Sequence, residues 1–442
     1  MRFGTDGIRG LANAELTPEL CLAIGRATAR VLGGPTVLIG RDTRRSGSMI
    51  EAALAAGICA EGVGVTLLGV VPTPAVAALG AADSLVGVVI SASHNAAPDN
   101  GIKVFGPGGT KLSDELQRRV EETIEEVRAG GGIGRGITGA ALGSIHSDAG
   151  GMGRYRSMLL DALEGRRLDG LEVVLDCANG AASGIAPEVF EALGASVHVL
   201  HANPDGLNIN DRCGSTHPED LSDAVVERGA QLGFAFDGDA DRVLAVDAAG
   251  RLIDGDQLIA VAALDLKRRG RLRGDSVVVT VMSNLGFRLG MAAAGIGLVE
   301  TAVGDRFVLE ALDRDGLSLG GEQSGHLIFR DLATTGDGVL SAVLISDVVV
   351  RSGISLSALA DAAMTRLPQV LRNVRLPERD PGLVGRLEPE IERARERLGA
   401  AGRVLVRESG TEPLVRVMVE ATDEAVAADV AEELVAAVEA AS

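Results

Sequence analysis

The chain has 442 residues and a formal net charge of -19, with a pI near 4.8. This acidic balance argues against a nucleic-acid partner, because binding to a phosphate backbone needs broad basic faces. A small phosphorylated substrate needs only a few local arginines and is not excluded. Hydrophobic residues make up 46% and aromatic residues 2%, so the cores must be packed from Ala, Val, Leu and Ile. The length predicts about three or four domains.

The N-terminus and the cysteines favour a soluble, cytoplasmic protein. Met1–Asp6 lacks the apolar stretch of a signal peptide, and the most apolar region, Val63–Ile90, is interrupted by two prolines and Asp83. We therefore expect no membrane partner, and the sequence leaves a homodimer open. The cysteines lack metal-type spacing and fit free thiols in a reducing compartment; they are Cys21, Cys59, Cys177 and Cys213.

Segments with helical spacing alternate with short apolar runs over the first 150 residues. The first helix is predicted to begin at Thr17-Pro18, because Pro is favoured in the first turn of a helix. This alternation predicts an α/β domain in which helices cover a sheet. The predicted helices are Leu16–Leu32, Met49–Glu61 and Ser113–Arg128, and the predicted strands are Thr36–Ile39, Val65–Val71 and Leu85–Ile90.

The strand-and-loop pattern at Val88 recurs at Val173 and Val277, and each later run is followed by a helix and a Gly-centred turn. We interpret this as a weak internal repeat of α/β units, because its period far exceeds the roughly 20 to 50 residues of solenoid repeats. After Arg366–Pro368 the composition shifts to a charged helix over Leu387–Leu398, two strand-like runs and an acidic Ala-rich helix. The last quarter therefore predicts a smaller α+β domain.

A short apolar run ends at Ile90 in Ser91-Ala92-Ser93-His94-Asn95, and Asp99–Lys103 follows. Ligands of α/β folds bind at such strand ends. Ser93 could be a nucleophile or a phosphate carrier, with His94 and Lys103 near enough in sequence to supply or remove a proton. Considered alone, the loop is more often a polar turn after a core strand.

A second apolar strand, Phe234–Phe236, runs into Asp237-Gly238-Asp239-Ala240-Asp241-Arg242. Alternating carboxylates repel one another, a bound divalent cation relieves this, and ligands that are all oxygens suit Mg²⁺. A calcium EF-hand would need Gly at Arg242 and Glu at Ala248. The same loop would also suit an aspartate-nucleophile phosphatase, with Asp237 as nucleophile, or a solvated acidic turn.

Two further loops combine glycine with polar side chains. In Gly320–His326, glycines let the backbone approach a ligand, and Glu322 and Ser324 can hydrogen-bond neighbouring sugar hydroxyls. Considered alone, this loop is more often structural. The loop at Arg407–Pro413 joins cations, hydroxyls and backbone N–H groups into an oxyanion cradle. Its groups are Arg407, Ser409, Gly410, Thr411 and, just beyond, Arg416.

With these loops in this order, the chain resembles the α-D-phosphohexomutase superfamily over essentially its whole length. The resemblance implies that Ser93 carries the phosphoryl group and that Arg9 faces it. The implied cofactor is Mg²⁺, held by Ser93, Asp237, Asp239 and Asp241. One departure is Ala96, where the family usually has Pro, which leaves the pose of His94 open.

The resemblance also assigns the remaining loops. Arg242, Glu322 and Ser324 would contact the substrate, and the loop at Arg407 would grip the phosphate that is not reacting. Lys103 is our candidate for the general base. His326 would be either a proton shuttle or an orienting donor.

The implied fold has three similar mixed-sheet α/β units plus a C-terminal α+β domain of the TATA-binding-protein-like type around a central cleft. We expect a phosphoserine-bearing domain at 1–150, a Mg²⁺-binding domain at 151–250, a sugar-recognition domain at 251–366 and a phosphate-binding domain at 367–442.

Asp205–Asn210, Cys213–Glu219 and Gln323 look like the glucosamine branch of the superfamily. This branch implies interconversion of glucosamine 6-phosphate and glucosamine 1-phosphate through a glucosamine 1,6-bisphosphate intermediate, toward UDP-N-acetylglucosamine and cell-wall synthesis. That bisphosphate or glucose 1,6-bisphosphate would be the activator. Two rival functions are the same chemistry on glucose or mannose phosphates, and a non-catalytic sugar-phosphate-binding protein.

Overall fold

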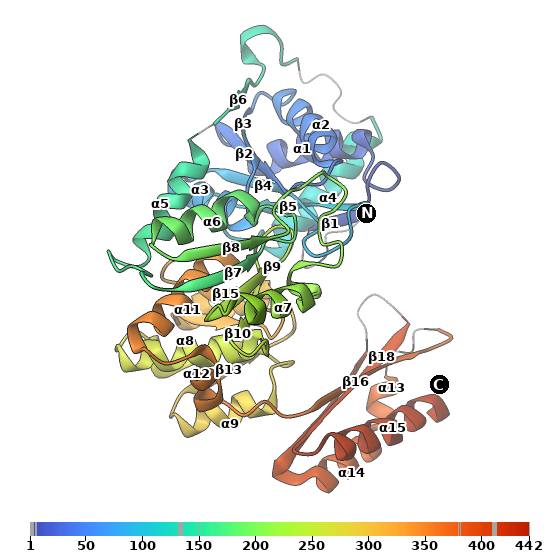
Figure 1. Cartoon of the computed structure of the whole chain (residues 1–442). Coiled ribbons are helices and arrows are strands. Elements are labelled where there is room, and N and C mark those ends of the chain that lie inside the picture. Colours follow the sequence, from blue (N-terminus) through green and yellow to red (C-terminus); the bar gives the residue numbers. More distant parts are fainter. Residues whose placement is uncertain are drawn as a thin grey trace. The chain divides into compact units, whose positions relative to one another are not determined.

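The computed structural model of the chain describes residues 4, 7–130, 136–148, 150–378, 380, 382–408 and 413–441 (Figure 1). Contacts divide the chain into two compact units, Met1–Met282 with Ile296–Ala360, and Ser283–Gly295 with Asp361–Ser442. The first unit holds three mixed sheets with helices, and the second holds a small antiparallel sheet. This confirms the expected fold class of three α/β units followed by an α+β domain.

The first sheet has six strands in the order β1-β5-β4-β2-β3-β6. Strands β4, β2, β3 and β6 are parallel neighbours, whereas β5 is antiparallel to both β4 and β1. The strands are β1 (Ile8–Leu11), β2 (Thr36–Arg41), β3 (Gly64–Val70), β4 (Val86–Ile90), β5 (Asp99–Phe105) and β6 (Ile145–Ser147). The helices are α1 (Pro18–Leu32), α2 (Gly47–Cys59), α3 (Thr73–Asp83) and α4 (Asp114–Arg128).

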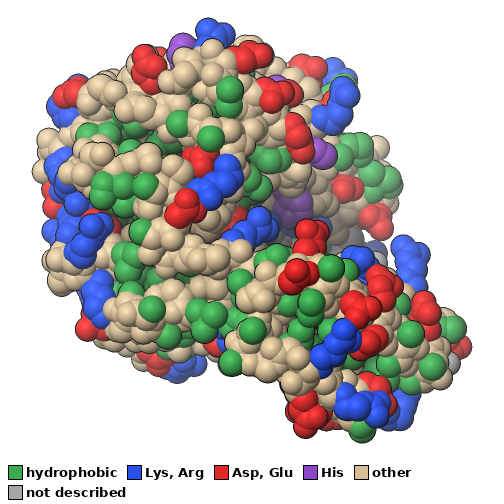
Figure 2. Space-filling model, turned by 60° about the horizontal axis from the view of Figure 1, so that its bottom comes forward, with side chains coloured by type: hydrophobic (Ala, Val, Ile, Leu, Met, Phe, Trp, Pro, Cys, Tyr) green, Lys and Arg blue, Asp and Glu red, His purple; other side chains and the backbone are tan. Residues whose placement is uncertain are grey.

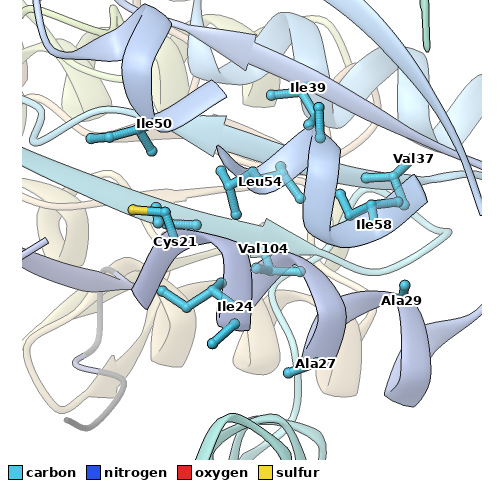
Figure 3. Close-up of a cluster of buried hydrophobic side chains, with 14 of the residues drawn as sticks. Cys21, Ile24, Ala27, Ala29, Val37, Ile39, Ile50, Leu54, Ile58 and Val104 are labelled. Atoms are coloured by element: carbon cyan, nitrogen blue, oxygen red, sulfur yellow. The ribbon is translucent and has the colours of Figure 1, made fainter. Parts of the chain in front are cut away.

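Helices α1, α2 and α4 pack on one face of this sheet, and α3 contacts β2 and β4 (Figure 1). Figure 3 shows Ile24 of α1 and Ile58 of α2 facing the sheet residues Val37 and Val104. The Thr17 hydroxyl accepts a hydrogen bond from the Leu20 amide and caps α1, as the sequence predicts. The apolar spacing of α1 therefore buries one stripe of the helix against the sheet whose strands β4 and β5 flank Ser93.

The second sheet has the order β11-β10-β9-β7-β8, and the third has the order β13-β12-β14-β15. The second domain contains β7 (Glu172–Asp176), β8 (Ser196–Leu200), β9 (Leu232–Phe236), β10 (Val243–Asp247), β11 (Leu252–Ile253), α5 (Gly151–Asp161), α6 (Ala182–Ala192) and α7 (Glu219–Arg228). The third contains β12 (Ser276–Thr280), β13 (Gly297–Thr301), β14 (Leu319–Gly321), β15 (Leu327–Phe329), α8 (Gly255–Arg268), α10 (Asp305–Asp315), α11 (Gly338–Ser352) and α12 (Leu356–Ala363). The second sheet continues just past residue 250, because β11 pairs with β10.

The three sheets share one plan, with a parallel group β4-β2-β3, β9-β7-β8 or β14-β12-β13 beside one antiparallel strand, β5, β10 or β15. The runs at Val173 and Val277 are β7 and β12, so they correspond to β2 and not, as the sequence pattern suggested, to the strand at Val88. Parallel strands that are buried on both faces all have short runs of β-branched residues. Such a run does not indicate which neighbouring strands it pairs with.

The second unit is built on an antiparallel sheet in the order β16-β18-β17, consistent with the expected α+β character. Residues of its helices and strands form one core, which includes Leu434 of the last helix and Val417 of the central strand. The predicted charged helix is α14. The elements are β16 (Gln369–Arg375), β17 (Gly402–Glu408), β18 (Leu414–Ala421), α9 (Leu285–Ala293), α13 (Leu383–Arg386), α14 (Glu388–Leu398) and α15 (Glu424–Ala441).

On the face drawn in Figure 2, acidic and basic side chains are interspersed over the described residues and do not gather into one broad basic area. Among the described helices, none has by itself the length and hydropathy needed to span a membrane. Helices α11 and α12 meet these criteria only when taken together, and they are bent by 97° relative to each other.

Candidate active site

Three loops that hold predicted site residues occupy the same place in their sheets. The serine loop (residues 91–98) joins β4 to β5, the metal loop (237–242) joins β9 to β10, and the sugar loop (322–326) joins β14 to β15. Each therefore connects a parallel strand to its antiparallel neighbour. The Ser93 hydroxyl donates to Asp237 Oδ2 at 2.5 Å, and the Val243 amide donates to the Gly325 carbonyl at 2.9 Å, so these contacts bring the three loops together.

Ser93 is fully buried and has a φ of 52°, a left-handed backbone conformation that is unfavourable for a side chain other than glycine. Its amide donates to Ser91 Oγ at 2.9 Å. Conformations of this kind persist where surrounding contacts enforce them, and they cluster at functional sites. The hydroxyl is thereby directed toward the carboxylates of the metal loop.

His94 Nδ1 lies 3.4 Å from Ser93 Oγ. Burial lowers the pKa of His94, and the nearby Arg242 and Arg9 lower it further. Since a lowered pKa favours the neutral imidazole, the ring can accept a proton at neutral pH. Arg9 Nη1 also donates to Asn95 Oδ1 at 3.4 Å, which places its charge beside the serine loop.

The carboxylates of Asp237, Asp239 and Asp241 are buried, with one oxygen of each within 4.8 Å of the others. Burial raises the pKa of Asp237 well above its usual range, and Asp241 and Asp239 add to the shift. Asp239 Oδ1 and Asp241 Oδ1 accept no hydrogen bond from any described residue. Buried carboxylate oxygens that accept no hydrogen bond fit a small divalent cation such as Mg²⁺, which prefers oxygen ligands.

The other oxygens of these two aspartates are already occupied. Lys103 Nζ donates to Asp239 Oδ2 at 2.8 Å and to Asp241 Oδ2 at 3.0 Å. The Thr73 hydroxyl also donates to Asp239 Oδ2, at 2.6 Å. Burial by itself raises the pKa of Asp241, but Lys103 and other nearby cations outweigh it and hold that pKa well below the usual range. These contacts fix how the two carboxylates are turned.

Arg242, the last residue of the metal loop, and His326 of the sugar loop both lie close to Asp241. The Arg242 amide donates to Asp237 Oδ1 at 3.2 Å, and its Nε lies 3.8 Å from Asp241 Oδ1. His326 is buried, with Nδ1 3.7 Å from Asp241 Oδ1 and Nε2 accepting the Gly336 amide at 3.1 Å. This buried position beside Asp241 suits an orienting role better than that of a proton shuttle, which must reach a substrate.

The sugar loop presents one anchored and one open polar residue. Glu322 is buried, and its Oε1 accepts the Gly304 amide at 3.0 Å, whereas Ser324 is exposed. Gly325 has a φ of 93°, and a Cβ there would lie 2.3 Å from the Val243 carbonyl oxygen. Only glycine permits this approach, which docks the sugar loop on the strand that follows the metal loop.

In the second unit, Arg407 of β17 lies directly opposite Arg416 of β18 in the antiparallel register. Like charges in this position destabilise a sheet unless an anion compensates them. Burial and the neighbouring Arg416 lower the pKa of Arg407. The pair is therefore a candidate phosphate-binding site, while the predicted partners Ser409, Gly410 and Thr411 lie outside the described residues.

Sequence reasoning missed four residues that contact these loops. Thr73 binds Asp239, and Asp42, Arg44 and Asn210 contact the serine loop or its supports. The run Asp42-Thr43-Arg44 follows a predicted strand, and Asn210 ends a stretch already singled out. Neither sequence position indicates a contact with the serine loop, because these residues approach it only when the strands pair and the sheets pack.

A separate group of side chains, Asp176, His201 and Cys213, lies in the second domain. His201 Nδ1 is 3.1 Å from Asp176 Oδ2, and its Nε2 is 3.2 Å from Asp220 Oδ2. The adjacent Asp176 carboxylate raises the pKa of His201. Asp176 also accepts the Ala178 and Gly214 amides, so we assign this group a structural role.

Comparison with known proteins matches the whole arrangement. Domain profiles described as phosphoglucomutase/phosphomannomutase alpha/beta/alpha domains I, II and III match residues 1–130, 154–250 and 254–367, and the profile of the C-terminal domain matches 364–437. Proteins named phosphoglucosamine mutase from Rhodococcus jostii and Streptomyces griseus are each 54% identical, over 98% and 95% of both chains.

A solved structure described as a phosphoglucomutase/phosphomannomutase family protein from Burkholderia thailandensis has a TM-score of 0.80 and 25% identity, and covers 99% of this chain and 97% of its own. An N-acetylphosphoglucosamine mutase structure from Aspergillus fumigatus has the same fold, with a TM-score of 0.72, 20% identity, and coverage of 100% and 95%. With all four domains matched in order and half of the residues shared with full-length relatives, the chain belongs to the phosphoglucomutase/phosphomannomutase family.

Proposed function

We propose that the chain catalyses the phosphoglucosamine mutase reaction, interconverting glucosamine 6-phosphate and glucosamine 1-phosphate through phosphorylated Ser93. The observation that carries this proposal is the 2.5 Å contact between the Ser93 hydroxyl and Asp237, within a carboxylate cluster in which two described oxygens accept no hydrogen bond. Relatives of this name share about half of the sequence. Phosphorylated Ser93 would donate to the free sugar hydroxyl, and the resulting glucosamine 1,6-bisphosphate would return its other phosphate to the serine.

Asp237, Asp239, Asp241 and an oxygen of phosphorylated Ser93 would hold Mg²⁺. When bound, the ion supplies positive charge that neutralises the oxygens of the transferring phosphoryl group. The calcium EF-hand hypothesis loses support because the loop joins two paired strands instead of two helices.

Lys103 remains the proposed general base for the attacking hydroxyl. Its two hydrogen bonds to Asp239 and Asp241 favour the ammonium form, so it can act as a base only when those carboxylates are engaged elsewhere. His94, with its lowered pKa and its position 3.4 Å from Ser93 Oγ, is placed to exchange a proton with the serine itself. Arg9 would stabilise the phosphoserine and His326 would orient Asp241.

For the substrate, Arg407, Ser409, Gly410, Thr411 and Arg416 would bind the phosphate that is not transferred. Arg242, Glu322 and Ser324 would contact the rest of the sugar phosphate. Glucosamine 1,6-bisphosphate or glucose 1,6-bisphosphate would serve as the activator that first phosphorylates the enzyme. The described cysteines are all free, which fits the proposed cytoplasmic setting of UDP-N-acetylglucosamine synthesis.

The deciding experiment measures kcat/KM for glucosamine 6-phosphate, glucose 1-phosphate and mannose 1-phosphate with Mg²⁺ and a trace of the matching bisphosphate. A preference of about a hundredfold for glucosamine 6-phosphate supports the assignment, whereas equal turnover of glucose or mannose phosphate favours those substrates instead. Ser93→Ala should abolish turnover and the phosphorylated species seen by intact mass. Full activity of that variant would defeat the phosphoserine mechanism.

A further inference from the structure

Two side chains from different domains bind the same two carbonyl groups of the serine loop. Arg44 Nη2 donates to the Ser93 carbonyl at 2.9 Å and to the Asn95 carbonyl at 2.8 Å. Asn210 Nδ2 donates to the same carbonyls at 2.8 and 2.9 Å. Arg44 follows β2 in the first sheet, whereas Asn210 lies between β8 and α7 in the second domain. The carbonyl groups of the two residues that flank His94 are therefore each held from two directions.

Arg44 reaches further along the same loop. Its Nη1 donates to the carbonyl groups of Ala96 and Asp99, the latter at 3.0 Å. Ala96 is the position where the family usually has Pro, so here hydrogen bonds to Arg44 restrain this part of the chain. Arg44 therefore restrains the backbone on both sides of His94.

A buried network holds Arg44 itself in place. Its side chain is almost completely buried, and Nε donates to Asp42 Oδ2 at 2.9 Å. The same carboxylate oxygen accepts the Ser91 hydroxyl at 2.6 Å, and Ser91 Oγ in turn accepts the Ser93 amide. Asp42 therefore supports the N–H group of Ser93 through Ser91, and Arg44 binds its C=O group directly. Together these bonds hold Ser93 rigidly.

These bonds matter because of the backbone conformation of Ser93. A φ of 52° is unfavourable for serine, so the loop would relax if its carbonyl partners were removed. The metal loop also passes close by, since a Cβ on Gly238 would lie 2.6 Å from the Ser93 carbonyl oxygen and 2.8 Å from Asn210 Nδ2. The contact between Ser93 Oγ and Asp237 therefore depends on the close packing of Gly238 against the Ser93 carbonyl and Asn210.

We propose that Arg44 and Asn210 are positioning residues that clamp the Ser93 and Asn95 carbonyls and thereby direct the Ser93 hydroxyl toward the metal loop. It follows that Asn210 governs the rate of phosphoryl transfer and not the choice of sugar. Asn210 belongs to the stretch Asp205–Asn210 that resembles the glucosamine branch, yet its amide nitrogen is committed to the serine loop. This inference rests on the proposed function of Ser93.

The test compares Asn210→Ala with wild type on glucosamine 6-phosphate and glucose 1-phosphate. We expect kcat to fall by about 30-fold for both sugars, because a small misplacement of a reacting group costs up to about a hundredfold. KM and the ratio of kcat/KM values between the two sugars should stay within about threefold of wild type. Arg44→Lys keeps the positive charge but loses the planar arrangement of donors. It should likewise lower kcat and leave KM nearly unchanged.

Thr43→Val is the matched control. It removes another hydrogen bond between the first and second domains, from the Thr43 hydroxyl to the Asn179 carbonyl at 2.6 Å, and leaves the serine loop untouched. This variant should keep the wild-type kcat. Thermal unfolding of all variants checks that each is folded, and Asn210→Ala decides the question if Arg44→Lys fails to fold.

Hydrogen exchange provides a readout that does not depend on turnover. Amides in residues 91–99 should exchange faster in Asn210→Ala than in wild type or Thr43→Val. An unchanged kcat, or a change of tenfold or more in the preference between the sugars, would overturn the positioning role. If wild type turns over no hexose phosphate, the proposed function fails, and unchanged exchange in residues 91–99 would independently overturn the clamp.

Discussion

Three carboxylates lie within 4.8 Å of one another beside Ser93, in a buried space where like charges repel strongly. Lys103 offsets part of this charge through its contacts with Asp239 and Asp241, but Asp237 keeps a raised pKa. A divalent cation would favour the ionised form of Asp237, because a nearby positive charge lowers the pKa of a carboxyl group. A bound cation would therefore relieve the repulsion within this cluster.

Replacing Asp239 by Asn should weaken metal binding selectively. One of three negative ligands is lost, so the Mg²⁺ concentration needed for half-maximal activity should rise by about tenfold or more. A Mg²⁺ titration of the mutase rate measures the shift. Asp223→Asn, an exposed position on α7, is the control and should titrate like wild type. An unchanged titration for Asp239→Asn would remove this residue from the metal site.

Lys103→Arg separates charge balance from general-base catalysis. Arg keeps a positive charge near Asp239 and Asp241, but it cannot release a proton in a protein. If Lys103 is the base, kcat should fall by about a hundredfold or more while the thermal midpoint stays close to wild type. Near-normal turnover would restrict Lys103 to charge balance and leave His94 as the better candidate for proton transfer.

At the scale of elements, the three α/β units repeat local details as well as topology. Strand β2 ends where Asp42 accepts the amide two residues ahead, and β7 ends with the same turn at Asp176. Strand β12 ends with the corresponding turn at Thr280. In each unit the neighbouring parallel strand, β4, β9 or β14, leads into one of the three loops of the candidate site. The repeated unit therefore includes both the sheet and the position of its site loop.

A buried contact between α5 and the start of α11 predicts a pH-dependent stability. The Tyr155 hydroxyl donates to Asp337 Oδ2 at 2.8 Å, and burial raises the pKa of Asp337 to about 6. Because the folded pKa exceeds the unfolded one, the protonated acid stabilises the fold below about pH 4, and this contribution is lost as the pH rises through about 6. The total change is about 3 kcal/mol.

Urea unfolding of wild type and Asp337→Asn at pH values from about 4 to 7 tests this. The amide keeps the helix cap to the Leu340 amide but cannot ionise, so the stability difference between the two proteins should change over this range in favour of the variant at higher pH. Circular dichroism is the suitable signal. A difference that does not vary with pH would show that Asp337 does not titrate in the folded protein.

At the scale of the whole molecule, the proposed function uses residues of both compact units. Ser93, the metal loop and the sugar loop belong to the first unit, and the opposed pair Arg407 and Arg416 belongs to the second. A substrate with a phosphate at one end and a reacting hydroxyl at the other needs both kinds of group. A net charge of -19 does not oppose this proposal, because a small anion needs only local arginines.

Arg416→Ala should raise KM for glucosamine 6-phosphate by about tenfold or more, because a charge-assisted phosphate contact is lost. Steady-state kinetics measures the change, and hydrogen exchange in residues 407–416 should fall when substrate binds to wild type. Arg372→Ala, on β16 of the same sheet, removes an exposed ion pair with Glu432 and should leave KM unaltered. If both variants behave alike, the phosphate does not bind at Arg416.

Much of the fold and part of the site could be predicted from local patterns. Thr17 caps its helix as expected, and the strands that end at Ile90 and Phe236 lead into the serine and metal loops. The predicted alignment of the repeated units was wrong. It matched β7 and β12 with the strand at Val88 instead of β2, because all of these buried parallel strands have similar sequences. Arg44 and Asn210 were missed, since they reach the Ser93 carbonyl across separations of 49 and 117 residues.

The sequence by itself determined the order of α/β units, the strand ends that carry hydroxyl and carboxylate groups, and the family resemblance. These features are local, because periodicity, capping and charge spacing act over a few neighbouring residues. Tertiary structure alone decided that Lys103 and Thr73 hold Asp239, that His326 lies beside Asp241, and that Arg44 and Asn210 share two carbonyl groups. Such contacts depend on which strands pair and how the sheets pack, and no stretch of neighbouring residues specifies that.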